Sequence, residues 1–171
     1  FCYYGTWSHD LDASFVDALA GGGFKTTVRG YTKAGAPPLD PRVSRHDPVA
    51  REELAASLAP YGVLLLPYRL NPFLMGVIPA KIYECLATGR PVIATPLPSL
   101  KALEGLIYIG ETPEAWVKIA RALPDTETAA LRAARIAHAR AHSAETEFGR
   151  LKSSLEAAVT RHAERSSFPG R

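Results

Sequence analysis

Cysteine is scarce in this sequence. The chain has two cysteines, Cys2 and Cys85, with no CxxC pair and no Cys/His spacing that is typical of a zinc ligand set. A disulfide framework and a structural zinc site are therefore excluded as the basis of the fold. Such sparing use of cysteine is typical of proteins in a reducing compartment, and we expect a cytoplasmic location.

Long apolar runs and a large excess of one charge are also missing. No stretch approaches the roughly 20 apolar residues that span a bilayer. Lysine and arginine total 20 against 17 acidic residues, which gives a formal net charge of +3, and the basic residues are spread along the chain. This pattern argues against a nucleic-acid-binding protein, whereas a mildly basic surface favours anionic substrates. At 171 residues, 47% of them hydrophobic, the chain is long enough to bury one substantial core.

Short apolar strands alternate with helices along the chain. We expect strands at residues 1–4, 25–29, 42–46, 61–66, 91–94 and 106–109. We expect helices at residues 11–19, 78–88 and 99–103, one from Asp47 to the turn at Pro60, one from Thr112, and helical structure from Thr126 onward with a break near His142. Ser8 or Asp10 is the expected cap of the first helix. Strands that alternate with helices about every 20 residues predict an α/β fold, a doubly wound parallel six-stranded sheet of the Rossmann-like type with additional C-terminal helices.

This fold class also predicts where a ligand binds. In a doubly wound sheet of order 3-2-1-4-5-6, ligands bind beyond the carboxyl ends of the strands, at the point where the strand order reverses. That point lies between the first and fourth strands. The loops that follow these strands begin with Gly5 and Thr6 and with Tyr68 and Arg69. We therefore expect these four residues to border the site.

The helix predicted at residues 78–88 begins beside this crevice. Free amides at a helix N-terminus favour phosphate, and the backbone of Gly76, Val77 and Ile78 would suit a pyrophosphate. Lys81 in the first turn adds a full positive charge. Glu84 lies on the same helical face, and a carboxylate can accept hydrogen bonds from two vicinal hydroxyls, such as those of a ribose. The alternative is an ordinary i,i+3 ion pair between Lys81 and Glu84 on the helix surface.

The same stretch carries a family resemblance. The pattern Pro79-x-Lys81-x-Tyr83-Glu84-x-Leu86-Ala87-x-Gly89-x-Pro91-Val92 resembles the donor-binding signature of GT-B-fold glycosyltransferases. It is similar, more narrowly, to bacterial enzymes of exopolysaccharide and teichuronic-acid assembly. Tyr4-Gly5 at the first turn, Leu54 behind two glutamates, and the helical C-terminal end agree with it. The similarity covers about residues 1–160, which corresponds to the C-terminal, donor-binding half of such an enzyme.

The resemblance implies roles for particular residues. Glu84 would bind the ribose hydroxyls, while Lys81 and the backbone of Gly76, Val77 and Ile78 would bind the diphosphate. His46 and Val49, with the residues between them, would border the base. Tyr68 and Arg69 at the end of the fourth strand would contact the diphosphate or the sugar.

Two departures from the family pattern leave the stereochemical outcome open. Many retaining relatives carry a second glutamate eight positions before the one that Glu84 matches, and this chain has Gly76 there. Many also carry an arginine and a lysine in and after the first turn, for the diphosphate, and this chain has neither. Thr6, Ser8 and His9 are the substitutes that the sequence offers.

The resemblance also implies a domain organisation and a reaction. Residues 1–165 would form the donor-binding domain and residues 166–171 a flexible tail. Because residues 1–4 already resemble a strand, we expect the N-terminal acceptor domain to be absent from this chain. The complete enzyme would be a hexosyltransferase that moves a sugar from a UDP- or GDP-sugar to a glycan or lipid-linked acceptor in cell-surface polysaccharide synthesis, without a metal or other cofactor. Its catalytic residues would lie on the absent domain, so this half alone is expected to be inactive.

Other interpretations stay open at the level of sequence. A nucleotide-sugar epimerase would share the two-domain architecture, and a non-catalytic nucleotide-binding module would share the site. Asp10 and Asp12 have the spacing of a metal motif in the other large glycosyltransferase fold, but they lie at a helix start, where aspartate is expected as a cap. We expect no metal site.

Partners follow from the same resemblance. The N-terminal half is the expected protein partner, and the inner face of the bacterial plasma membrane is a second. The alanine- and arginine-rich stretch at residues 128–142 is expected to be a solvated helix packed lightly on the sheet, or a contact surface for the absent half or for anionic lipid.

Overall fold

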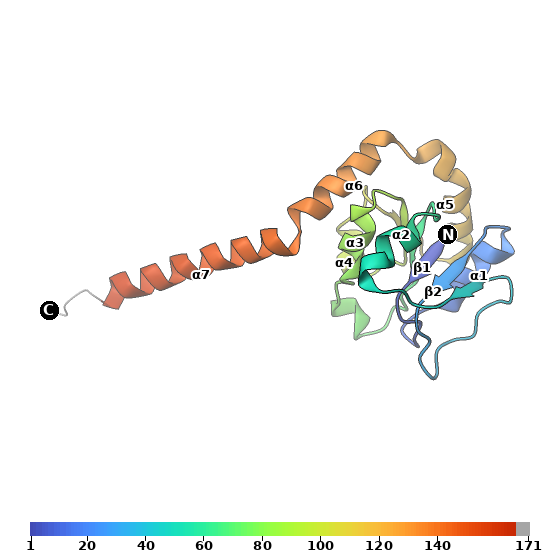
Figure 1. The fold of residues 1–171 in the computed structure, drawn as a ribbon, viewed down its shortest axis with the longest axis horizontal. Coiled ribbons are helices and arrows are strands. Elements are labelled where there is room, and N and C mark those ends of the chain that lie inside the picture. The colour runs from blue at the N-terminus through green and yellow to red at the C-terminus, as the bar shows by residue number, and fades with distance from the viewer. Residues whose placement is uncertain (167–171) are drawn as a thin grey trace.

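The computed structural model describes residues 1–166, with side chains up to His162. Its centre is an all-parallel, six-stranded sheet of order β3-β2-β1-β4-β5-β6 (Figure 1). The strands are β1 (Cys2–Tyr4), β2 (Thr27–Arg29), β3 (Ser44–His46), β4 (Leu64–Leu66), β5 (Val92–Ala94) and β6 (Tyr108–Ile109). The predicted fold class and strand order are confirmed, and the observed strands lie inside the predicted ranges.

Helices connect the strands and continue beyond the last one. They are α1 (Ala13–Gly21), α2 (Leu54–Leu58), α3 (Lys81–Ala87), α4 (Pro98–Lys101), α5 (Pro113–Thr126), α6 (Ala129–Ala141) and α7 (Ala144–Ser166), with 3-10 turns η1 (Arg51–Glu53) and η2 (Leu74–Gly76). Ser166, which was predicted to belong to the tail, still lies in α7. Residues 167–171, the rest of that predicted tail, lie outside the described residues.

The sheet is covered on both faces, because successive side chains of a strand point to opposite sides. Tyr3, Val28, Leu65 and Ile93 pack with α1 and α5 in one core cluster. The alternate strand positions pack with α2, α3 and α4 in a second cluster, where α6 adds Ala139. Two apolar layers therefore enclose the strands, which explains why their sequences are apolar without alternation.

Two helix starts were predicted wrongly on the N-terminal side of the chain. The cap of α1 is Asp12, whose side chain accepts from the amide of Ser14, whereas Ser8 and Asp10 bond to each other in the preceding turn. The helix after β3 begins with η1 and α2, later than Asp47, and Ala50, directly before η1, still has an extended backbone.

The helix after β4 also starts later than predicted. It was expected at Ile78, but α3 begins at Lys81. Asn71 accepts the amide of Leu74 through its side chain and so builds η2, which ends at Gly76. Ile78 precedes a proline, and this position disfavours helical backbone angles. Residues 77–80 therefore enter the helix as an irregular segment.

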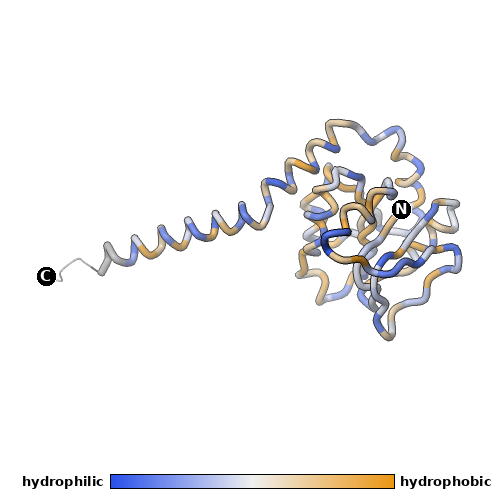
Figure 2. The backbone as a smooth tube through the Cα atoms, viewed as in Figure 1, coloured by the Kyte–Doolittle hydropathy of each residue, from blue (hydrophilic) through white to orange (hydrophobic). Residues whose placement is uncertain are grey.

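The C-terminal helices divide as expected near His142, which caps α6. Helix α6 packs on α3 and buries Arg135 and Ala139, so it is more firmly docked than the lightly packed helix predicted for residues 128–142. Helix α7 then leads away from the α/β body (Figure 1). Apolar and polar positions alternate along its turns (Figure 2). None of the helices among the described residues has the length and hydropathy needed to cross a bilayer.

Candidate functional site

The carboxyl ends of β1, β2 and β3 border three adjoining cavities, which we call the carboxyl-edge groove. The first, of about 430 Å³, lies between α2 and α3 and includes Glu84. The second, of about 140 Å³, lies over the turns after β1 and β2, and the third, of about 450 Å³, lies beyond β2 and β3. Tyr4 and Leu54 line both the first and the second cavity, and Gly30, Tyr31 and Pro48 line both the second and the third. The groove is therefore continuous across three strand ends.

Tyr4 and Glu84 meet at the first cavity. The Tyr4 hydroxyl donates to Oε2 of Glu84 over 3.1 Å. Burial, together with the neighbouring Cys85 and Glu84, raises the pKa of Tyr4 well above its ordinary value, so the hydroxyl stays protonated and can act as the donor. The predicted alternative, an i,i+3 ion pair between Lys81 and Glu84, is not formed among the described residues. The exposed carboxylate of Glu84 thus faces the groove with one orienting hydrogen bond.

Lys81 turns inward instead of toward the groove. Its ammonium donates to the Tyr4 carbonyl over 2.8 Å and to the Tyr3 hydroxyl over 3.1 Å. It also lies 4.4 Å from the centre of the Tyr3 ring, a cation–π distance. Burial lowers the pKa of Lys81 to about 8. The sequence predicted a first-turn phosphate ligand, but the structure places this ammonium beneath the turn after β1.

Two glycines allow the turns after β1 and β2 to approach each other. Gly5 and Gly30 have φ angles of +121° and +136°, in the region that favours glycine. A Cβ on Gly5 would lie 2.3 Å from Nζ of Lys81, and a Cβ on Gly30 would lie 2.2 Å from the carbonyl oxygen of Gly5. The backbone therefore passes closely over the buried ammonium, and no side chain separates the two turns.

Arg29 is a groove residue that the sequence reasoning missed. It lines the second cavity, and its Nη1 donates to the carbonyl of Asp47 over 3.1 Å. Its Nη2 lies 3.3 Å from Nδ1 of His46. A signal was present in the sequence, because Arg29 precedes Gly30 just as Tyr4 precedes Gly5, each pair ending a strand. Of the predicted base-site residues, His46 lines the third cavity and Val49 the second.

Other predicted residues lie elsewhere. Tyr68 and Arg69 line a separate cavity of about 350 Å³ beyond β4, and Nε of Arg69 donates to the carbonyl of Leu11 over 3.0 Å. The amides of Gly76 and Val77 donate within the η2 turn. Because α3 begins at Lys81, residues 76–78 do not form its N-terminus as predicted, and their contact with a diphosphate stays a prediction. Gly5 and Thr6 do line the second cavity, as expected.

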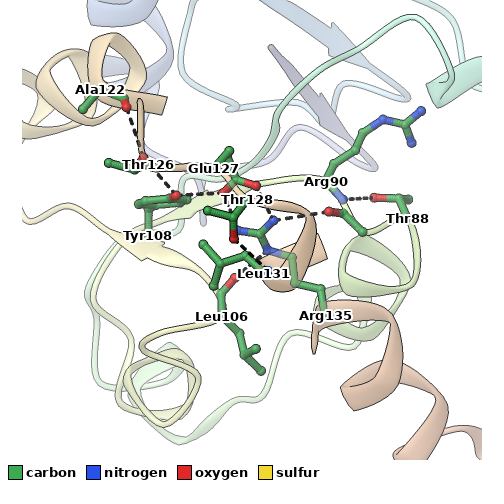
Figure 3. Close-up of polar contacts among 11 residues, drawn as sticks. Thr88, Arg90, Leu106, Tyr108, Ala122, Thr126, Glu127, Thr128, Leu131 and Arg135 are labelled. Carbon is green, nitrogen blue, oxygen red and sulfur yellow. Dashed lines mark hydrogen bonds and ion pairs between the residues drawn. The ribbon is translucent and has the colours of Figure 1, made fainter. Parts of the chain in front are cut away.

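A cavity of about 740 Å³, larger than those of the carboxyl-edge groove, lies at the opposite edge of the sheet, where β1, β4 and β5 begin. Next to it, Arg135 is 1% exposed and forms two hydrogen bonds of 2.6 and 2.7 Å with the carboxylate of Glu127 (Figure 3). Arg135 also donates to the carbonyl of Leu106, and Tyr108 donates to Glu127. These groups satisfy one another, so they fix α6 to the sheet. Ligands of doubly wound folds bind at the other edge, so the carboxyl-edge groove is the candidate site although its cavities are smaller.

Comparison with known proteins gives one partial match. No family model matches the chain. A segment of 40 residues is 40% identical to a protein of Bacillus subtilis (strain 168) named "Putative teichuronic acid biosynthesis glycosyltransferase TuaH". The segment covers 23% of this chain and 10% of that protein. A short part of the chain is therefore similar to a glycosyltransferase, and the chain matches only a small fraction of that relative's length.

Proposed function

We propose that this chain is the donor-binding half of a GT-B-fold glycosyltransferase. The observation that carries the proposal is the carboxylate of Glu84, which Tyr4 orients at the head of a groove across the carboxyl ends of β1, β2 and β3. The short similarity to the Bacillus subtilis protein supports the reaction class. The complete enzyme would transfer a hexose-type sugar from a nucleoside diphosphate sugar to a glycan or lipid-linked acceptor in cell-surface polysaccharide synthesis.

The groove suggests how the donor lies. The ribose hydroxyls donate to the free oxygen positions of Glu84, and the base extends through the second and third cavities, past Val49 toward His46. The diphosphate then lies over the turn at Gly5 and Thr6. Lys81 lies directly beneath this turn and contributes positive charge without contacting the phosphates, because its ammonium is already bound to the Tyr4 carbonyl.

The chemistry of this half is electrostatic. Negative charge develops on the diphosphate as it leaves the sugar, and fixed positive charge near it lowers the barrier. We propose no metal for this step. The groups that activate the acceptor belong to the N-terminal half, so the chain alone binds the donor and turns over little or none.

Helix α7 supports the proposal that another part of the enzyme packs against this one. Phe148, Leu151, Leu155 and Val159 lie on one helical face and are 57–69% exposed. Such a row of large apolar side chains is uncommon on a free surface. We propose that the N-terminal half covers it, on the cytoplasmic side of the plasma membrane, and that hydrogen exchange along α7 slows when that half is added.

The proposal is tested by titration calorimetry of the wild-type chain with UDP, GDP and their sugars. We expect at least one nucleotide to bind with a Kd well below millimolar. Glu84→Gln should weaken binding by about tenfold or more, because hydrogen bonds to a charged carboxylate are worth about 1.5–3 kcal/mol. Glu156→Gln, at an exposed position on α7, is the matched control and should bind like wild type. Absence of submillimolar binding, or equal affinity in the Glu84→Gln variant, would overturn the donor-site assignment.

A further inference from the structure

Tyr4, Arg29 and His46 form a single row across three neighbouring strands. Tyr4 pairs with Arg29 in the register of β1 and β2, and Arg29 pairs with His46 in the register of β2 and β3. Paired residues of a parallel sheet point to the same face. The row therefore continues from Glu84, through the Tyr4 hydroxyl, to the guanidinium of Arg29 at the centre of the groove.

The guanidinium of Arg29 has donor capacity to spare. An arginine side chain offers five N–H groups and no acceptor. Two of these groups face the Asp47 carbonyl and Nδ1 of His46. Among the described residues, no carboxylate lies within ion-pair distance of Arg29, and its buried Nε has no hydrogen-bond partner. The remaining N–H groups on the two Nη atoms can still donate, so this site favours a ligand that presents acceptors.

We propose that Arg29 selects the base of the donor and that the selected base is a keto base, guanine or uracil, in preference to adenine. This inference rests on the proposed function, since it assigns a part of the nucleotide to a part of the same groove. Arg29 lies one strand spacing, about 5 Å, from Tyr4, and Tyr4 bonds to Glu84. In the proposed arrangement the ribose lies at Glu84, the nucleoside extends along this row, and the edge of its base meets Arg29.

The preference follows from hydrogen-bond chemistry. Guanine and uracil carry carbonyl oxygens at their exocyclic positions, and guanine offers two neighbouring acceptors that match an arginine fork. Adenine keeps the N7 acceptor but carries an amino group beside it, and this donor would face a side chain that has donors only, so one of the two hydrogen bonds of the fork is lost. A donor that faces only donors forms no hydrogen bond, so adenine binds less tightly at this position.

Arg29 also has a structural task, because it ties β2 to the Asp47 carbonyl and to His46. If this were its only role, replacing Arg29 would shift the end of β3 and lower the affinity for all nucleotides by the same factor. The quantity that separates the two roles is therefore the ratio of the Kd for ADP to the Kd for GDP or UDP. A structural role leaves this ratio unchanged, whereas base selection makes it depend on the side chain at position 29.

The experiment is calorimetric titration of UDP, GDP and ADP into the wild-type chain, Arg29→Gln and Arg29→Lys. The control is Arg121→Gln, at an exposed position on α5 away from the groove. In wild type, GDP or UDP should bind at least about tenfold more tightly than ADP. Arg29→Gln should bring this ratio close to one, because glutamine presents both a donor and an acceptor. Arg29→Lys, which keeps the charge without the planar fork, should retain only part of the preference.

The outcomes separate this inference from the proposed function. If wild type binds ADP as tightly as GDP and UDP, or if Arg29→Gln leaves the ratio unchanged while Glu84→Gln still weakens binding, the role of Arg29 is overturned and the donor site stands. If no nucleoside diphosphate binds wild type, both are overturned. The wild-type ratio decides the preference even if Arg29→Gln fails to fold.

Discussion

The hydroxyl of Tyr4 donates a hydrogen bond of 3.1 Å to Oε2 of Glu84, although 80 positions separate the two residues in the chain. This bond links the end of β1 to the face of α3 that borders the carboxyl-edge groove. It fixes the direction of a carboxylate that is otherwise exposed. The proposed ribose site therefore depends on a tyrosine from the neighbouring element as well as on Glu84 itself.

Tyr4→Phe should weaken binding of a nucleoside diphosphate by about 3- to 10-fold, because the variant loses the bond that orients Glu84. The free energy of unfolding should fall by about 1 kcal/mol. The matched control is Tyr108→Phe, which removes a similar hydroxyl-to-carboxylate bond to Glu127 at the opposite edge of the sheet. The control should lose similar stability in urea unfolding and no affinity in calorimetry. Equal affinity in Tyr4→Phe and wild type would show that this bond has no part in binding.

Gly30→Ala should lower the free energy of unfolding by about 3 kcal/mol or more, since the new Cβ meets backbone and the φ angle disfavours an L side chain. The clash is with the carbonyl oxygen of Gly5 at 2.2 Å, which cannot rotate away. Gly62→Ala is the control, because no atom lies within 4 Å of its Cβ and its φ is not left-handed. The control should change stability by less than about 0.5 kcal/mol. Similar Tm values for the two variants would contradict the close approach of the two turns.

Lys81 should make stability rise with pH in an alkaline window. Burial lowers the pKa of Lys81 from 10.5 to about 8, so between these values the unfolded chain holds a proton that the folded chain has lost. Stability increases with pH wherever the unfolded state binds more protons. The difference in unfolding free energy between wild type and Lys81→Met should therefore shift in favour of wild type by up to about 3 kcal/mol from pH 7.5 to 10.5. If this difference does not change with pH, or shifts in favour of the variant, the ammonium of Lys81 is exposed to solvent and the account is contradicted.

Glu127→Gln should lower the free energy of unfolding by about 3 kcal/mol, because it leaves the buried Arg135 without its counter-charge. Burial alone would raise the pKa of Glu127, but hydrogen bonds from Arg135 and Tyr108 outweigh it and hold that pKa below its ordinary value. Wild type should therefore lose this stabilisation as the pH falls below about 4.5, and the variant should lack that loss. Glu156→Gln, whose exposed partner Lys152 lies 4.0 Å away, should change stability by less than about 1 kcal/mol. Equal urea midpoints for the two variants would contradict the structural role of the buried pair.

The strand order could be predicted from local sequence, and the candidate site at the carboxyl edge follows from it. The apolar, unalternating segments that end at Tyr4 and Leu66 indicate strands buried on both faces, and the rules of doubly wound sheets supply the order. Glu84 is the candidate that the sequence itself offers, because its neighbours carry the resemblance, and its ligand stays a prediction. Each of these patterns lies in a short stretch of the sequence and can be recognised without knowledge of the packing.

The remaining details depend on contacts between distant segments. The direction of Lys81 is set by two tyrosines of β1 and by the absence of a side chain at Gly5. Helix α3 begins later than predicted because the Asn71 side chain builds a separate turn before it. The strand register brings Arg29 beside Tyr4 and His46, and its place before Gly30 was the one sequence signal for it. The fold could therefore be predicted from the sequence, whereas the directions of several side chains at the carboxyl edge could not.

The central claim is that Glu84 holds the ribose of a nucleotide. Its most direct test is the ratio of the Kd for the 2′-deoxy form to the Kd for the ribose form of the best-binding nucleoside diphosphate, measured by calorimetry in wild type and in Glu84→Gln. We predict that the deoxy form binds wild type about tenfold more weakly, and that the ratio falls close to one in the variant. A ratio near one in wild type, or the same ratio in both proteins, would contradict the account.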